Sequence, residues 1–273
     1  MSEQTAILAT DGEPITVERL KADLAALGVV AGMTLLVHSS LRSLGWVCGG
    51  PVAVVLALSE LLGPEGTLVM PTHTSDLSDP ADWQHPPVPA SWWETIRRAT
   101  PAYDPATTPT RQMGAIVECF RTWHGSLRSA HPQASFAARG RYAKRITAEH
   151  QLANSLGEGS PLAQIYALGG WVLLLGVDHG NNTSLHLAEY RAAYPAKQVV
   201  TLGAPMLVDG AQQWVTFADI DLNSDDFSAL GASFAASGHE RCGRVGMAES
   251  RLMTQPALVD FAVGWMEQHR KTV

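Results

Sequence analysis

The beginning of the chain alternates between segments whose apolar residues have helical spacing and short segments that are apolar throughout. Residues 15–28 place apolar side chains three and four positions apart and stop at Gly28, which predicts an amphipathic helix. The segment MTLLVHSS (33–40) predicts a buried strand that ends in a polar turn. A helix over 51–63 and a second buried strand over 66–74 follow, so this strand–helix–strand unit predicts parallel pairing.

The texture of the sequence changes between about residues 75 and 110, where prolines and tryptophans alternate with acidic residues. This composition predicts an irregular excursion with one short helix near SWWETIRRA. The earlier pattern returns with a helix over 114–123 and a third buried strand, WVLLLGV, over 171–177. That strand leads into a helix over TSLHLAEYRAAY, so we expect the parallel core to continue past the excursion.

After Pro195 the pattern changes to alternating strands that meet at Asp209-Gly210, a dipeptide typical of hairpin turns. A final amphipathic helix, PALVDFAVGWMEQHR, follows, and no repeat or low-complexity linker separates the segments. The sequence therefore predicts a single α/β domain over residues 1–273. Its central, mostly parallel sheet is flanked by helices, with an inserted loop region at about 75–110 and a C-terminal antiparallel portion.

Composition and charge narrow the class of protein. Of its 273 residues, 46% are hydrophobic and 16% are charged, as expected for a globular protein with a well-buried core. The formal net charge of -7 argues against broad contact with nucleic-acid phosphates. The absence of a basic, apolar leader and of any long apolar run argues against export and membrane insertion. Because Cys48, Cys119 and Cys242 form no C-x-x-C pair, we expect a reducing, cytoplasmic location.

Polar residues gather where the predicted strands end. Groups at 38–40 and 72–74 follow the first two strands, 178–186 follows the third, and an RSAHP segment at 128–132 adds a fourth group. In open parallel sheets, ligands bind at the carboxyl ends of strands, because loop amides and helix N-termini converge there. We therefore expect a binding site at this edge of the sheet.

The motifs of several common enzyme classes do not occur in the sequence. There is no G-x-S-x-G elbow, no G-x-x-x-x-G-K-[ST] loop and no G-x-G-x-x-G, which argues against a hydrolase, nucleotide hydrolysis and hydride transfer. Neither H-E-x-x-H nor H-x-H occurs, so we expect no metal site. Five histidines nevertheless lie in the polar groups: His38, His73, His131, His179 and His186.

Two of these histidines, His179 and His186, differ in their place relative to the predicted helix. If Thr183 is the N-cap, His186 is the third helical residue and lies in the positive field of the helix start. That field disfavours an imidazolium ion, so we expect His186 to be neutral near pH 7 and able to accept a proton. His179 precedes the cap and is a candidate for contact with a ligand.

Four segments in this order, LLVHSSLRSLG, GPEGTLVMPT, RSAHP and LLLGVDHGNNTSLHLAE, resemble the aminoglycoside 3-N-acetyltransferase (antibiotic N-acetyltransferase) family. The resemblance runs from about Val17 to about His269. It implies acetyl transfer from acetyl-coenzyme A to the 3-amine of a 2-deoxystreptamine ring, by a histidine base without an acyl-enzyme. It also implies His186 as the base and Asp221 as its acidic partner, whereas Glu189, one helical turn away, is the local alternative.

The resemblance further implies residues that bind the two substrates. HSS and RSAHP resemble coenzyme-binding turns, and an arginine is a natural partner for a coenzyme phosphate. Acidic residues near the site would suit an acceptor that carries several ammonium groups. The coenzyme candidates are His38, Ser39, Ser40, Arg128 and Ser129, and the candidates for the aminoglycoside are Asp219, Asp76 and His179.

Two alternatives remain open at this point. The same transfer chemistry could act on a different small-molecule amine, and an acceptor site without carboxylates would favour that interpretation. The chain could also be a coenzyme-binding module without catalysis; if it is an enzyme, replacing His186 by alanine should abolish turnover and leave coenzyme binding intact.

Overall fold

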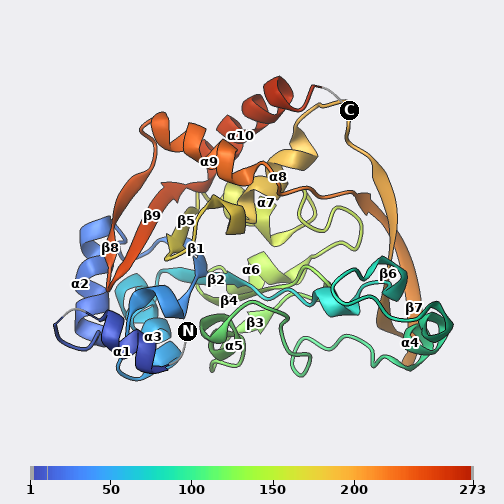
Figure 1. Cartoon of the computed structure of the whole chain (residues 1–273), viewed down its shortest axis with the longest axis horizontal. Coiled ribbons are helices and arrows are strands. Elements are labelled where there is room, and N and C mark those ends of the chain that lie inside the picture. The colour runs from blue at the N-terminus through green and yellow to red at the C-terminus, as the bar shows by residue number, and fades with distance from the viewer. Residues whose placement is uncertain (1–2, 11, 272–273) are drawn as a thin grey trace.

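The computed structural model describes residues 3–10 and 12–271, so the predicted domain of residues 1–273 extends beyond the described part (Figure 1). None of the described helices is long and apolar enough to cross a bilayer. The helices are α1 Glu3–Ala9, α2 Val17–Leu27, α3 Gly50–Leu62, α4 Trp93–Ala99, α5 Ala115–Arg121, α6 Ala143–Ala148, α7 Pro161–Ala167, α8 Ser184–Arg191, α9 Phe227–Ala236 and α10 Gln255–His269. The strands are β1 Thr34–Ser39, β2 Thr67–Pro71, β3 Leu127–Arg128, β4 Phe136–Gly140, β5 Trp171–Leu175, β6 Val199–Val208, β7 Ala211–Ile220, β8 Arg241–Val245 and β9 Ala248–Thr254.

Seven strands form one sheet in the order β3-β4-β2-β1-β5-β9-β8, and its parallel pairs lie at the centre. β1 pairs in parallel with β2 and with β5, and these are the three strands predicted from continuous apolar runs. Antiparallel strands extend the sheet on both sides, β4 and β3 beyond β2 and β9 and β8 beyond β5. The α/β prediction is therefore confirmed, and within the seven-stranded sheet the parallel pairs are those of β1 with β2 and β5.

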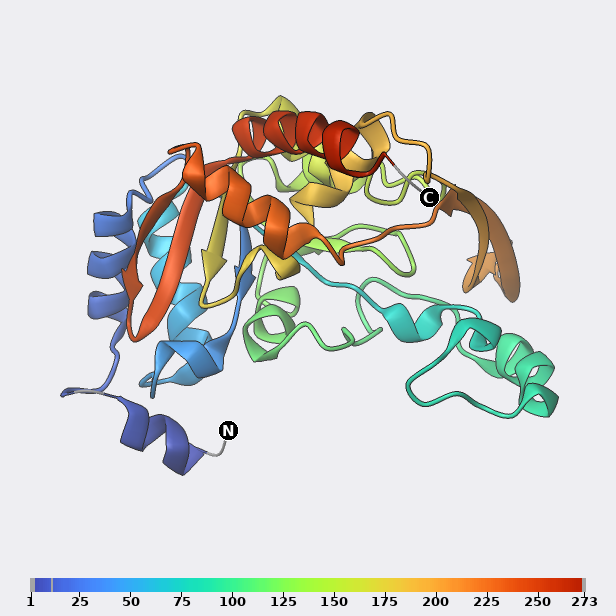
Figure 2. The ribbon, with the colours of Figure 1, turned by 45° about the horizontal axis from the view of Figure 1, so that its top comes forward.

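Helices cover both faces of the sheet, because alternate side chains of a strand point to opposite sides. Leu35 and Val37 of β1 belong to a core that includes α2, α3 and α5. Leu36, which lies between them, belongs to a second core with α6, α7, α8, α9 and α10 on the other face. Figure 2 shows α10 lying across the top of the molecule, in the second of these layers.

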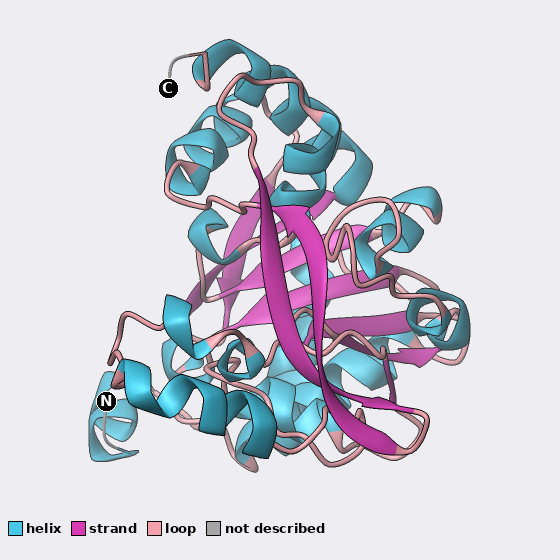
Figure 3. Ribbon diagram, turned by 90° about the vertical axis from the view of Figure 1, so that its right-hand side faces the viewer, coloured by secondary structure: helices cyan, strands magenta, loops and turns pink. Residues whose placement is uncertain are grey.

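The excursion between about 75 and 110 is irregular, as predicted, and contains the short helix α4. It lies beside a two-stranded sheet of β6 and β7 that is separate from the central sheet (Figure 3). These strands turn at Asp209 and Gly210, whose φ angles of 50° and 79° fit the predicted hairpin turn. Gln212 of β7 donates a hydrogen bond of 3.2 Å to the carbonyl oxygen of Arg97, which ties α4 to the hairpin.

Candidate functional site

The carboxyl ends of β1, β2 and β5 lie side by side, and each leads to one of three histidines. His38 is the last residue but one of β1, and His73 comes two residues after β2. His186 lies on α8, which follows the loop that leaves β5. His38 and His73 share a space of about 110 Å³, here named the histidine cavity. Its lining includes His38, Ser39, His73, Gln112, Asn181 and Thr183.

The two histidines of the histidine cavity are uncharged at neutral pH. Burial, followed by repulsion from His186 and His179, lowers the pKa of His38 to about 3. Burial and then His186 also lower the pKa of His73 to about 3. Nε2 of His38 lies 3.3 Å from Oγ1 of Thr183, whereas the buried Nε2 of His73 has no hydrogen-bond partner in the described part of the chain. Within residues 3–10 and 12–271, no three His, Cys, Asp or Glu side chains are grouped as a metal site.

His186 is the third residue of α8, which is the place expected from the sequence. The helix begins at Ser184, whose N–H donates to Oδ1 of Asn182 at 3.2 Å. Thr183 occupies the N-cap position, but its side chain does not cap the helix. The ring of Phe227 packs against the imidazole with centroids 4.8 Å apart, and 15% of the His186 side chain is exposed. His186 is therefore held by packing while one edge stays accessible.

Glu189, one turn further along α8, is hydrogen-bonded through Oε2 to Nδ1 of His186. Its side chain is fully buried, and Oε1 accepts from Nη1 of Arg270 at 2.7 Å and from the Asn223 N–H at 3.0 Å. A carboxylate only accepts hydrogen bonds, so Nδ1 of His186 carries the hydrogen and the lone pair of the neutral ring lies on Nε2. This arrangement orients the imidazole as a proton acceptor.

The expected hydrogen bond between His186 and Asp221 is not formed. Asp221 comes directly after β7, its side chain is exposed, and its N–H donates to the carbonyl oxygen of Gln198 at 2.9 Å. The segment after β7 reaches the buried pair with the backbone N–H of Asn223 instead. Of the two partners considered for His186, the structure brings Glu189 to the imidazole.

The two serines after β1 face different spaces. Ser39 lines the histidine cavity, and its buried Oγ has no hydrogen-bond partner among residues 3–10 and 12–271. Oγ of Ser40 accepts a hydrogen bond of 3.0 Å from Ser43, and Ser40 lines a larger space of about 570 Å³. We name this space the serine hollow. Its lining includes Ser40, Ser43, Asp178, Asn181, Met247 and Arg251.

Arg128 was expected to meet a coenzyme phosphate, but its guanidinium group is used inside the protein. Nη2 donates to the carbonyl oxygen of Thr72 at 2.7 Å, Nε donates to Oγ of Ser135 at 3.1 Å, and Nη1 donates to the carbonyl oxygen of Thr108. The group also lies 5.2 Å from the ring centre of Tyr103. Burial lowers the pKa of Arg128. These contacts tie β3 to the ends of β2 and of the excursion, and no nitrogen of the guanidinium is left without a partner.

Ser129, the other coenzyme candidate of the RSAHP segment, is fully buried. Its Oγ accepts the Phe136 N–H at 2.9 Å and lies 2.9 Å from Nδ1 of His150. Burial lowers the pKa of His150 to about 3 and that of the adjacent His131 to about 4, so both rings are neutral. The segment therefore forms a polar network inside the protein, because β3 and β4 fold it against the loop that contains His150.

Asp219, expected to bind a cationic substrate, is also committed to internal contacts. It is 4% exposed, and Oδ1 accepts a hydrogen bond of 2.6 Å from the hydroxyl of Tyr190. Oδ2 accepts the Ser155 N–H at 3.0 Å. Burial, together with the bond to Asp219, raises the pKa of Tyr190 well above its usual range. The end of β7 thus uses this carboxylate to fasten itself to α8.

His179 lies in the loop before α8, as expected, but its side chain faces inward, and the residue is 4% exposed. Nε2 lies 2.7 Å from Oε2 of Glu240, whose Oε1 is 3.2 Å from Nε of Arg251. Nδ1 lies 3.4 Å from Nδ2 of Asn182. Because Asn182 also accepts the first N–H of α8, these contacts fix the start of the helix that carries His186.

Asp76 is exposed and lines a third space, of about 410 Å³, between the excursion and the segment before α5. Its carboxylate is therefore available to a ligand, and the indole of Trp83 lies in the same lining. We name this space the tryptophan hollow. Its lining includes Asp76, Trp83, Gln84, His85, Arg111 and Gln112.

The histidine cavity adjoins both hollows, because they share lining residues. Val177 and Asn181 line the serine hollow as well as the histidine cavity. Gln112 lines the histidine cavity as well as the tryptophan hollow. Its φ of 58° is uncommon for a residue other than glycine. The sequence analysis predicted neither Asn181 nor Gln112 as a site residue, since a single Asn or Gln forms no motif.

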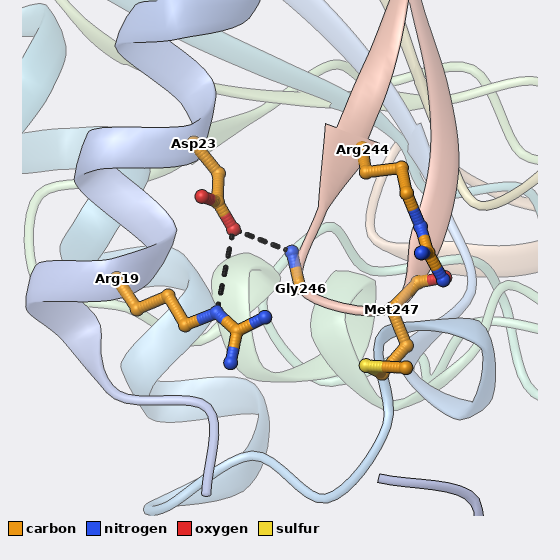
Figure 4. A pocket seen from close by; sticks show the side chains of 5 residues that line it. All are labelled: Arg19, Asp23, Arg244, Gly246 and Met247. Atoms are coloured by element: carbon orange, nitrogen blue, oxygen red, sulfur yellow. Dashed lines mark hydrogen bonds and ion pairs between the residues drawn. The ribbon is translucent and has the colours of Figure 1, made fainter. Parts of the chain in front are cut away.

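A further small hollow of about 190 Å³ lies beyond the serine hollow, with which it shares Met247 (Figure 4). Arg19 of α2 and Arg244 of β8 reach it from two sides. Asp23 is already partnered, since Oδ2 accepts the Gly246 N–H at 2.8 Å and lies 3.8 Å from Nε of Arg19. The hollow in Figure 4 therefore presents two arginines and one partly neutralised carboxylate.

Both the sequence and the fold are shared with known proteins. A model of the aminoglycoside 3-N-acetyltransferase family matches residues 36–267. The chain is 45% identical, over 92% of its length and 92% of that protein, to the SPbeta prophage-derived aminoglycoside N(3′)-acetyltransferase-like protein YokD of Bacillus subtilis (strain 168). It is 39% identical, over 97% of its length and 96% of that protein, to aminoglycoside N(3)-acetyltransferase VII of Streptomyces paromomycinus. The solved structure of AAC-IIIb in a binary complex with CoASH is 34% identical, covers 96% of this chain and 99% of that chain, and has a TM-score of 0.84.

Proposed function

The chain belongs to the aminoglycoside 3-N-acetyltransferase family, and on that premise we propose that it transfers acetyl from acetyl-coenzyme A to the 3-amino group of 2-deoxystreptamine aminoglycosides. One observation supports this above others. The oriented pair of His186 and Glu189 is found at the same sheet edge as the histidine cavity, which adjoins a separate hollow on each side. A reaction between two substrates needs one space for each and a proton acceptor where they meet.

The serine hollow suits the coenzyme. It is the larger of the two hollows, and it adjoins the histidine cavity, whose lining includes Ser39. Among the described residues, the Ser39 hydroxyl has no hydrogen-bond partner. At its outer end, Arg19 and Arg244 lie in the adjoining hollow of Figure 4, whereas Arg251 in the lining is paired with Glu240 and Glu249. Arginines bind phosphate oxygens through paired N–H groups, so this end matches the nucleotide of coenzyme A. The proposed coenzyme therefore runs from these arginines to the histidine cavity.

The tryptophan hollow suits the acceptor. Asp76 offers a carboxylate to an ammonium group, and Trp83 offers an aromatic face to a sugar ring. Gln112 stands between this hollow and the histidine cavity and can accept or donate a hydrogen bond to an acceptor that reaches inward. A carboxylate in this lining favours an aminoglycoside over a neutral or anionic amine.

The proposed reaction is a direct attack of the 3-amine on the thioester carbonyl carbon. An ammonium ion has no lone pair, so the acceptor first loses one proton to solvent. Nε2 of His186 then takes a second proton from the amine nitrogen as it attacks, an effect typically worth about 10²- to 10⁴-fold. A C–N bond forms as the carbonyl becomes a tetrahedral intermediate. The C–S bond then breaks, and the thiolate of coenzyme A takes the proton from His186. The products are the N-acetylated aminoglycoside and the free thiol, and no acyl-enzyme forms.

Two further residues have stated tasks in this mechanism. The free hydroxyl of Ser39 would donate to the carbonyl oxygen, where negative charge grows in the tetrahedral intermediate. Glu189 would hold Nδ1–H of His186 and stabilise the imidazolium ion as it forms. The neutral rings of His38 and His73 add no positive charge that would repel the cationic acceptor.

Thiol release from acetyl-coenzyme A in the presence of a panel of 2-deoxystreptamine aminoglycosides tests the proposal. We expect one thiol per acetylated acceptor, with the new amide at the 3-position by mass spectrometry and NMR. His186→Ala should abolish thiol release while the coenzyme still binds by calorimetry. Release with other small amines but with no aminoglycoside would instead support the alternative acceptor. Binding of coenzyme without release in the unmodified protein would support a non-catalytic module.

A further inference from the structure

Arg270 connects the end of the last helix to the His186–Glu189 pair. It follows α10 directly, and its Nη1 donates to Oε1 of Glu189 at 2.7 Å. The other edge of the guanidinium binds Asp226: Nε donates to Oδ2 at 2.7 Å, and Nη2 donates to Oδ1 at 2.6 Å. On the basis of the function proposed above, we infer that Arg270 is a positioning residue, which holds Glu189 as a carboxylate in the geometry that orients His186.

The guanidinium of Arg270 is fixed from several directions. Nη2 also donates to the carbonyl oxygen of Asn223 at 2.9 Å, and the group lies 5.1 Å from the ring centre of Tyr194. Only 11% of its side chain is exposed. Burial by itself lowers the pKa of Arg270, but the hydrogen bonds to Asp226 and Glu189 outweigh burial and raise it. Arg270 is therefore a permanent cation with little freedom to move.

The helix that leads to Arg270 is itself part of the protein core. α10 packs along α8, and Val259, Ala262 and Met266 of α10 are fully buried in the same core as Leu185 of α8. Figure 1 shows α8, which carries His186, and α10 close together. A rigid helix pair, rather than a loose chain end, thus sets the distance between Arg270 and Glu189.

Other charged groups near the pair cannot replace Arg270. Nζ of Lys197 donates to the carbonyl oxygens of Tyr190, at 3.0 Å, and of Ala192, and burial lowers its pKa although Glu189 acts in the opposite direction. Arg270 is thus the cation in hydrogen-bond contact with Glu189. The titratable and charged groups that interact with the pair are His38 and His73 at the ends of β1 and β2, Lys197 and Tyr194 after α8, and Asp226 before α9, which binds Arg270.

Loss of Arg270 should change the pH at which the pair gives up its proton. A buried carboxylate without a fixed cation retains a neighbouring proton more strongly, because separation of charge in a low-dielectric site is unfavourable. The imidazolium of His186 would then be the cation left in contact with Glu189. The base form of His186 would accordingly appear only at higher pH.

Arg270→Gln tests this inference. We expect the acidic limb of the kcat/KM profile to move upward by about one pH unit, so that kcat/KM below the limb falls by about tenfold, with an unchanged KM for coenzyme. Arg270→Lys keeps the charge but cannot span both Asp226 and Glu189. It should leave the limb in place and lower kcat by roughly threefold. Arg191→Gln is the matched control, because it removes a cation of α8 whose partner is Glu158, at 2.6 Å.

The imidazole NMR signals of His186, assigned by their loss in His186→Gln, give a readout that needs no turnover. An upward shift of that titration in Arg270→Gln, and none in Arg191→Gln, is the expected result. An unmoved titration and limb, with only a lower melting temperature, would make Arg270 merely structural and overturn the inference. If Arg270→Gln does not fold, an Arg270→Lys protein with wild-type kcat would overturn it as well. Absence of thiol release in the unmodified protein would defeat the proposed function instead, and the NMR titration would still test Arg270.

Discussion

Nδ1 of His186 is hydrogen-bonded to Oε2 of Glu189, one turn further along the same helix. The pair is local in sequence, but its environment is not. Phe227 covers the imidazole, and Arg270 and the Asn223 N–H share the second carboxylate oxygen. The helix therefore supplies the pair, and segments from the last fifth of the chain set its orientation and charge.

The identity of the acidic partner can be decided by two isosteric substitutions. Glu189→Gln should lower kcat/KM by about 10²- to 10⁴-fold. The imidazolium ion of His186 would lose the carboxylate that stabilises it, and Nδ1–H would lose the acceptor that fixes the tautomer. Asp221→Asn should change kcat/KM by about twofold at most, since that side chain is exposed and Nδ1 of His186 is bonded to Glu189 instead. Steady-state kinetics at neutral pH gives both numbers. A larger loss in Asp221→Asn than in Glu189→Gln would restore Asp221 as the partner.

Asp76 should affect the acceptor and not the coenzyme. Asp76→Asn removes a charge from the tryptophan hollow, so we expect KM for a polycationic acceptor to rise by about threefold to tenfold. The effect should shrink at high salt, because screening weakens exposed charge pairs. Asp82→Asn, a neighbouring exposed carboxylate outside that lining, is the control. Equal rises in KM for Asp76→Asn and Asp82→Asn would indicate a general electrostatic attraction of the acceptor and not a contact with Asp76.

Arg128 should matter for stability more than for coenzyme affinity. Arg128→Gln leaves the carbonyl oxygen of Thr108 without its donor and removes one of the two donors to the carbonyl oxygen of Thr72, the other being Ser135. The free energy of unfolding should therefore fall by about 1–3 kcal/mol. Urea unfolding measures this change. Calorimetric titration with coenzyme A should show a Kd within about twofold of the unmodified protein. A large loss of coenzyme affinity with unchanged stability would support the phosphate contact expected from the sequence.

Four buried histidines should make the fold sensitive to mild acid. Burial lowers the pKa of His38, His73 and His150 to about 3 and that of His131 to about 4, below the ordinary value of 6.5. The unfolded chain therefore binds more protons below pH 6.5. The stability that these neutral rings contribute is complete above that pH. It is lost as pH falls toward the folded pKa values, at about 1.4 kcal/mol per pH unit for each histidine.

Urea unfolding between about pH 7.5 and 5 checks this expectation. The slope of the unfolding free energy against pH reports the number of protons taken up on unfolding, and His150→Gln should lower that number by one. His124→Gln, at an exposed position, should leave the slope unchanged. A flat dependence between pH 6.5 and 5 would mean that the buried rings are already protonated in the folded protein.

Two glycines inside helices should respond in opposite ways to alanine. A Cβ at Gly231 of α9 would collide with Cγ of His179, whereas a Cβ at Gly264 of α10 would meet nothing within 4 Å. Gly231→Ala should therefore cost about 1–3 kcal/mol, and it should lower turnover because His179 supports the start of α8. Gly264→Ala should stabilise by about 0.5–1 kcal/mol. Thermal unfolding and the thiol assay measure both, and equal shifts would contradict the predicted role of the His179 contact.

Much of the fold could be predicted from the hydrophobic pattern. The three central strands are continuous apolar runs, and the hairpin has its turn at Asp209 and Gly210, where both φ angles are positive. The flanking antiparallel strands were not predicted, because they are short or rich in small and charged residues, as in FAARG and RCGRV. Their pairing depends on neighbours far away in the sequence and leaves no local pattern.

The candidate site was predictable only in part, for the same reason. The position of His186 at a helix start and the spacing of Glu189 are properties of one segment, and they could be inferred from it. Arg128 and Asp219 are polar residues in suggestive motifs, yet tertiary contacts use their charged groups inside the protein. Arg270, by contrast, has no motif and gains its place from packing of α10 on α8.

The sequence by itself determined the family, the α/β core and the histidine at the start of α8, since these depend on periodicity and on short segments. Only the tertiary structure decided which polar side chains remain free. Burial and hydrogen-bond partners come from segments distant in the chain, so they withdraw Arg128, Ser129, Asp219 and His179 from ligands. In the part of the chain that the structure describes, the same long-range packing leaves the Ser39 hydroxyl at the histidine cavity without a hydrogen-bond partner.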